Sequence, residues 1–156
     1  MRLALAAFAL VILALVAAPA LAEPGYESGD REVNAQARTF FDQGMDHIKK
    51  KQWALAIQSF MQAVRIEPQY VEAWNNLGYA YRKNTDNQRA LDAYKRALEI
   101  RPDYKYAHEY IGRLYVALGN RAMAMRHYEI LRRLDAKLAA ELLRAIEAND
   151  ADLGDG

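Results

Sequence analysis

Cysteine is absent from the 156 residues of this chain. Without thiols the chain can form no disulfide framework. It also has no cysteine that could act in catalysis or accept a lipid. A charge excess is missing as well. Once Arg2, in the N-terminal apolar segment, is set aside, 20 basic side chains remain against 20 acidic ones. A general nucleic-acid binder needs a basic excess to displace counterions from phosphate, so we expect no nucleic-acid partner.

The residues of common catalytic and metal sites are scarce and poorly spaced. The only serines are Ser28 and Ser59, and neither lies on a sharp strand-to-helix elbow. The histidines His47, His108 and His127 lack the i, i+4 spacing of a helical metal site. The aspartates near the C-terminus lack the order and the closing glutamate of a calcium loop. We therefore expect a protein that is not an enzyme and that binds no cofactor or metal.

The one long apolar run lies at the N-terminus. It extends from Leu3 to Ala18, follows Arg2 and precedes an Ala-Leu-Ala pattern at 20–22. A transmembrane helix needs about 20 apolar residues, which is more than this run provides, so residues 1–22 are interpreted as a signal peptide that is cleaved before Glu23. The expected location is a bacterial periplasm. The alternative is an uncleaved N-terminal anchor, which would be the chain's only contact with a membrane.

The remaining sequence repeats with a fixed period, without insertion or deletion between residues 37 and 138. Positions one period apart carry similar residues: Gly44, Gly78 and Gly112; Ala56, Ala90 and Ala124; Phe60, Tyr94 and Tyr128; Pro68 and Pro102. A fixed period of about 34 residues is typical of stacked repeats, in which each unit needs its neighbours to bury its apolar face.

Each unit predicts two helices. In the stretch EAWNNLGYAY, residues 72–81, apolar residues recur every three or four positions, as on one face of a helix. A small residue at Gly78 allows the two helices of the unit to approach closely. Trp74, Leu77 and Tyr81 then fill the space around this contact. We interpret all four as packing residues and not as a binding site.

The pattern Trp-x2-Leu-Gly-x2-Tyr, followed by Ala, an aromatic residue, Ala and Pro, resembles the tetratricopeptide repeat. Residues 71–104 match at each of these positions, whereas 37–70 and 105–138 match more loosely. The resemblance implies an all-α, right-handed superhelical solenoid of three helix pairs. The remaining segments are then a leader with the start of the first helix (23–36), a capping helix (139–148) and a disordered acidic tail (149–156).

In such stacks the first helix of each pair lines a concave groove, which the resemblance makes the expected partner-binding surface. The residues it places there are Arg38, Phe41, Met45 and Lys49 in the first repeat, Glu72, Asn75, Asn76, Tyr79 and Arg82 in the second, and Tyr106, Glu109, Tyr110 and Arg113 in the third. The four aromatic residues of this set are expected to form one platform. Some members of the family bind chaperone C-termini through a carboxylate clamp. That is not expected here, because only Asn76 fits one of its five positions.

We therefore expect a protein–protein interaction module of the bacterial cell envelope that holds a peptide segment or helix of a partner in this groove. The alternative is a self-assembling scaffold, in which the open first repeat or the helix face of Leu138, Leu142 and Ile146 stacks on a second copy. A molecular mass that rises with protein concentration would favour this alternative.

Overall fold

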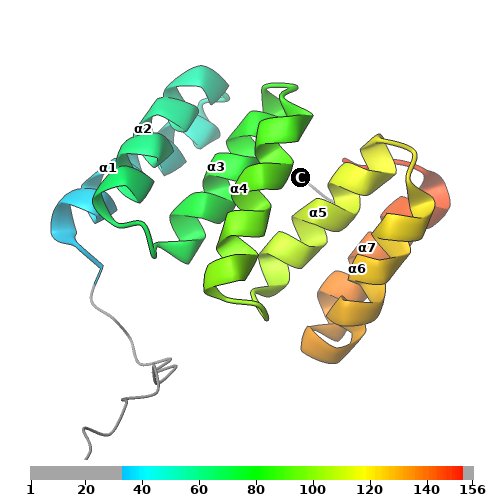
Figure 1. The fold of residues 1–156 in the computed structure, drawn as a ribbon. Helices are drawn as coiled ribbons and strands as arrows, with labels where there is room; N and C mark the ends of the chain where they lie inside the picture. The colour runs from blue at the N-terminus through cyan, green and yellow to red at the C-terminus, as the bar shows by residue number, and fades with distance from the viewer. Residues whose placement is uncertain (1–32, 153–156) are drawn as a thin grey trace, which may run out of the picture. The chain divides into compact units, whose positions relative to one another are not determined.

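The computed structural model describes residues 33–152, which contain seven α-helices and no strand. The helices are α1 (Ala35–Lys49), α2 (Trp53–Ile66), α3 (Val71–Lys83), α4 (Asn87–Ile100), α5 (Lys105–Ala117), α6 (Arg121–Leu134) and α7 (Ala136–Ala148). Figure 1 shows α1 beside α2, α3 beside α4 and α5 beside α6, with α7 packed on the last pair. The predicted solenoid of three helix pairs is confirmed.

Two predictions concern the N-terminal segments. The signal peptide at 1–22 lies outside the described residues, and so does most of the leader at 23–36. Within the described part, Asn34 caps α1, since its Oδ1 accepts hydrogen bonds from the Gln36 N–H at 2.9 Å and the Ala37 N–H at 3.3 Å. None of the helices in residues 33–152 has the length and apolar character to cross a bilayer.

Each helix pair turns at the same repeat position, and the backbone there has a positive φ. The residues are Lys51 (φ 56°), Thr85 (φ 65°) and Gly119 (φ 69°). The second helix of the later two pairs then begins at a capping side chain. Asp86 accepts a hydrogen bond from the Arg89 N–H and Asn120 from the Met123 N–H, each at 3.1 Å. Only the third pair has glycine at the left-handed position, where other residues are strained.

Glycine is required where the first helix of a pair meets a buried ring. A Cβ at Gly78 would lie 2.6 Å from both Cδ1 and Cε1 of Tyr94, and a Cβ at Gly44 would lie 2.6 Å from Cε1 of Phe60. Both rings are fully buried. Gly78 is therefore a packing residue, as the sequence predicts.

The third pair departs from this arrangement because α7 replaces the aromatic neighbour. A Cβ at Gly112 would lie 2.5 Å from Cδ2 of Leu142, a residue of α7. Tyr128, which has the repeat position of the buried rings, is only half-buried. α7 begins at Ala136, before the predicted start at 139, and Asp135 caps it by accepting from the Lys137 N–H at 3.0 Å.

The packing of α7 also corrects one part of the self-assembly hypothesis. Leu142 and Ile146 are buried within the chain, at 0% and 2% exposure, and Leu138 packs against the same cluster. This helix face is therefore not free to stack on a second copy.

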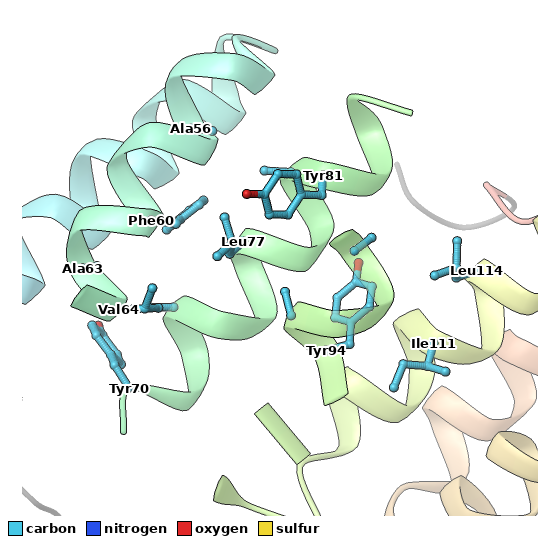
Figure 2. Close-up of a cluster of buried hydrophobic side chains, with 14 of the residues drawn as sticks. Ala56, Phe60, Ala63, Val64, Tyr70, Leu77, Tyr81, Tyr94, Ile111 and Leu114 are labelled. Carbon is cyan, nitrogen blue, oxygen red and sulfur yellow. The ribbon is translucent and has the colours of Figure 1, made fainter. Parts of the chain in front are cut away.

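The main core runs through the first two helix pairs into the third. Figure 2 shows side chains of α2, α3, α4 and α5 following one another, with Phe60 and Leu77 at one end and Tyr94 and Ile111 at the other. Alanines at the closest helix contacts are completely buried, including Ala56, Ala90 and Ala124, one period apart. Each helix pair therefore depends on its neighbour for the burial of its apolar face.

Candidate functional site

The residues of α1 that were predicted to line the groove do not converge on one site. Phe41 packs at a tilt on two core rings, at centroid distances of 5.6 and 5.0 Å. Met45 is half-buried against the same core. Arg38 and Lys49 are exposed, and each pairs with an aspartate of its own helix, at 3.4 and 3.0 Å. Such exposed pairs within a helix contribute little to stability or recognition.

Two aromatic residues of α3 and α5 do come together. The ring centroids of Tyr79 and Tyr110 lie 5.5 Å apart. The ring of Trp53, at the start of α2, packs edge-on against Tyr79 at a centroid distance of 6.1 Å. Tyr106 instead contacts Tyr104, at 5.6 Å, and is 42% exposed. The predicted platform of four rings is thus a Tyr79–Tyr110 pair, extended by a tryptophan that the sequence reasoning did not select.

A half-buried polar group lies on α3 near the start of the helix. Glu72 pairs with Arg101 at 3.2 Å, and the side chain of Asn76 donates a hydrogen bond to the Glu72 carbonyl at 2.8 Å. Arg101 also lies over the Tyr104 ring, 5.2 Å from its centroid. These contacts connect α3 to the loop before α5.

Three of the charged residues predicted for the groove, and one asparagine, are buried. Arg113 is 1% exposed, and its Nε donates to Oε1 of Glu109, which is 6% exposed, at 2.9 Å. Arg82 is also buried, at 8%. Asn75 is 3% exposed, and among the described residues its Oδ1 accepts no hydrogen bond. An open groove would leave these side chains accessible, so another part of the chain must cover them.

The chain beyond α7 folds back onto these residues. Asn149 adopts a left-handed conformation (φ 51°, ψ 41°), and the Asp150 N–H donates to the Ala145 carbonyl at 3.0 Å, which ends the helix. The Ala151 carbonyl then accepts from Nη1 of Arg113 at 3.2 Å. Residues 149–152 belong to the predicted disordered tail, and the structure instead gives them defined contacts.

Asp152 contacts two cations of α3. Its Oδ1 lies 3.1 Å from Nη1 of Arg82 and 2.8 Å from Nζ of Lys83. The hydrogen bond from Lys83 holds the pKa of the Asp152 carboxyl below its ordinary value, and the charges of Lys83 and Arg82 lower it further. Both cations also lie over the Tyr79 ring, at 5.6 and 5.7 Å. Lys83 was not selected from the sequence, although it directly follows Arg82.

We call Tyr79, Arg82, Lys83, Tyr110 and Arg113 the basic–aromatic surface. Its side chains come from α3 and α5, the first helices of the second and third pairs, which also contact each other. Its chemistry suits an extended peptide: rings for apolar groups, one guanidinium for a backbone carbonyl and two cations for a carboxylate.

The structure brings two histidines together that the sequence separates by 19 positions. Nδ1 of His108 lies 3.1 Å from Nδ1 of His127, and Nε2 of His108 lies 2.9 Å from the Pro102 carbonyl, to which it must donate. Burial, with the His108 ring beside it, lowers the pKa of His127 to about 4. In residues 33–152 no group of three or more potential ligands could hold a metal ion. The two rings thus form one hydrogen bond inside the third helix pair.

A hollow of about 740 Å³ lies on another surface, between α2 and α4. Trp74, Leu77 and Tyr81 form part of its lining, and charged side chains such as Arg89 and Glu99 surround them. Leu77 and Tyr81 are buried, at 3% and 8%, so they also have the packing role that the sequence predicts.

Comparison with known sequences identifies the repeats. The family model described as "Tetratricopeptide repeat" matches residues 71–104, and that described as "TPR repeat" matches 44–85. A chloroplast tetratricopeptide repeat domain-containing protein of Arabidopsis thaliana, PYG7, is 38% identical over 64 residues. The match covers 41% of this chain and 21% of that protein. Transferases are also among the curated relatives, and the match spans at most 9% of their length.

Solved structures share the fold. The first TPR of Spaghetti (RPAP3) bound to an HSP90 peptide, SRMEEVD, has a TM-score of 0.68 at 21% identity, over 72% of this chain and 91% of that one. The TPR2B domain of yeast Sti1 in complex with an Hsp70 peptide has a TM-score of 0.66 at 19% identity, over 74% and 94%. At these identities the likeness establishes the fold.

Proposed function

We propose that this chain, whose described helices form a tetratricopeptide-repeat solenoid, is a non-catalytic interaction module that holds a peptide segment of a partner protein. The basic–aromatic surface is the binding site. One observation carries the proposal: this surface already holds a short turn of the chain's own polypeptide, through hydrogen bonds and ion pairs to the Ala151 carbonyl and the Asp152 carboxylate.

Two further points support this assignment. The neighbours with the same fold include domains that were solved with a bound peptide of a partner. Tyr and Arg, which dominate the surface, are the residue types that most often anchor protein interfaces. Rings and cations supplied by two packed helices also need little reordering on binding, which favours affinity.

The partner is proposed to be a protein of the bacterial cell envelope. This part rests on the N-terminal sequence, where the apolar run and the cleavage pattern before Glu23 are typical of an export signal. Separating the periplasm from the cytoplasm of cells that produce the full chain, with N-terminal sequencing of the product, tests it. A protein that stays cytoplasmic with residue 1 intact would contradict it.

Site-specific cross-linking tests the binding function. A photoreactive amino acid placed at Tyr106, which is exposed beside the basic–aromatic surface, should capture the partner in living cells. The same probe at Arg133, an exposed position of α6, is the matched control. A product formed from both positions, or from Arg133 alone, would contradict binding at α3 and α5.

Self-assembly through the first helix pair is the second candidate. The observation in its favour is that Leu55 and Met61 of α2 are 42% and 48% exposed. Light scattering across a range of concentrations separates the two proposals. A mass that doubles with concentration in the parent but not in a Leu55→Gln, Met61→Gln variant would establish the self-assembling interface.

A further inference from the structure

The contact between residues 149–152 and the basic–aromatic surface resembles a ligand bound to a receptor. The receiving side chains are buried: the exposed fraction is 6% for the Arg82 side chain and 1% for that of Arg113. The Asp152 side chain on the other side is 67% exposed. Helices α3 and α5 thus supply buried cationic side chains, and the described part of the occupant presents a carbonyl and a more exposed carboxylate to them.

The atoms that dock could belong to many sequences. In the described residues 149–152, the polar atoms that bond to this surface are one main-chain carbonyl, from Ala151, and one carboxylate, from the next residue along the chain. The Ala151 side chain also packs against the apolar cluster that contains Leu142 and Ile146. No apolar side chain of this dipeptide is needed for these bonds. Recognition by the cations therefore depends on a main-chain carbonyl followed by an acidic side chain, and a partner segment with that pattern makes the same bonds.

The charge of the site favours such a partner. Within residues 33–152, the cations Arg82, Lys83 and Arg113 pair with the carboxylates of Glu109 and Asp152. A positive surface attracts an acidic segment and rejects a basic one.

We infer that the partner segment is acidic, and that it competes with the chain's own residues 151–152 for the basic–aromatic surface. This inference rests on the proposed function. Only Asn149 and Asp150 connect the docked dipeptide to α7, so it is present at a high effective concentration, about millimolar or above. Its ion pairs are partly exposed and individually weak. The segment therefore occupies the surface when no partner is present and leaves it when an acidic partner binds.

Competition predicts a gain of affinity when the internal segment is weakened. The protein is produced from its full coding sequence, as the parent and as an Asp152→Asn variant. The probe is a fluorescein-labelled peptide with the sequence EANDADLGDG, residues 147–156. We expect fluorescence anisotropy to give about tenfold tighter binding to Asp152→Asn than to the parent, because a larger fraction of the variant has an open site.

Two further variants locate the binding. Lys83→Gln, in the Asp152→Asn background, should weaken binding about two- to fivefold through the lost ion pair. Lys83 is partly exposed, so its replacement leaves the fold intact, which circular dichroism verifies. Lys95→Gln on α4 removes the same charge at an exposed position away from the surface and should change nothing.

A second peptide, in which every carboxylate is replaced by its amide, separates the two proposals. If it binds as tightly as the acidic peptide and Tyr79→Ala weakens both, the peptide-binding function stands and the inference of an acidic partner is overturned.

Equal affinity of the acidic peptide for the parent and for Asp152→Asn overturns the competition. The competition is also overturned if the molecular mass of the parent rises with protein concentration and that of Asp152→Asn does not. In that case the site binds the same segment of a second copy. If no peptide binds any variant, the inference is overturned, and the Tyr106 cross-link then decides the proposed function.

Discussion

Replacing Gly78 by alanine is the sharpest test of the helix contact that builds the second repeat. Two effects oppose each other. Alanine in a helix interior is favoured over glycine by about 1 kcal/mol. The added methyl group, however, would lie 2.6 Å from two ring carbons of Tyr94 and 3.0 Å from its Cγ. Carbon atoms pack at about 3.5–4.0 Å, so the ring or the helix must move.

The Tyr94 ring has little room to move. It is completely buried, and it also contacts the Tyr110 ring at a centroid distance of 5.7 Å. Overpacking a core of this kind costs about 1–3 kcal/mol. We take the upper part of this range, because the clash involves the ring near its attachment point. After the gain in helix propensity is subtracted, Gly78→Ala should destabilise the protein by about 1–2 kcal/mol.

Gly112→Ala is the matched control. Its Cβ would meet the two methyl groups of Leu142, the flexible end of an aliphatic side chain. A rotamer change there absorbs much of the clash, so the variant should lose clearly less stability than Gly78→Ala. Urea unfolding followed by circular dichroism measures both. If Gly78→Ala is as stable as the parent, or if the order of the two variants is reversed, the packing argument is refuted.

Three other changes test the account. Thr85→Gly should stabilise the protein by about 0.5–1 kcal/mol in urea unfolding, since it relieves a β-branched residue at φ 65°; a loss of stability would contradict the strain. Arg113→Met should cost about 3–5 kcal/mol because it leaves the Glu109 carboxylate buried without its cation, and adding Glu109→Gln should restore most of this. A pKa of His127 near 4, below that of an unfolded histidine, means that the native state binds fewer protons between pH 4 and 6.5. Stability should therefore be complete above pH 6.5 and fall towards pH 4, with a slope of at most about 1.4 kcal/mol per unit from this group; an unchanged pH dependence in His127→Gln would exclude that contribution.

The period of the sequence predicts most of the fold for a physical reason. Glycine at 78 and a ring at 94 are complementary halves of one contact, and the same two halves recur one period away at Gly44 and Phe60. Their recurrence specifies where each pair of helices meets. The third unit shows the limit of this reasoning. Its pattern is intact at Gly112, yet the neighbour is Leu142 of α7, because the repeat pattern contains no information about a helix that follows it.

The candidate site was harder to predict. The resemblance selects residues of α1, α3 and α5, among them Tyr79, Arg82 and Arg113, which the structure brings together near the folded-back segment. It cannot indicate that Asp152, 70 residues from Arg82, covers them. Composition alone suggests a solvated tail, because short acidic segments rarely pack. The contact exists because cations on two fixed helices face this segment.

The most direct test of the central claim is an NMR titration of the isotope-labelled Asp152→Asn protein with the acidic peptide of residues 147–156. The account predicts chemical-shift changes concentrated at Tyr79, Lys83, Tyr110 and Arg113, on α3 and α5. It predicts none at Arg89 and Glu99, which surround the hollow between α2 and α4. Changes centred on that hollow, or spread evenly over the helices, would contradict peptide binding at the basic–aromatic surface.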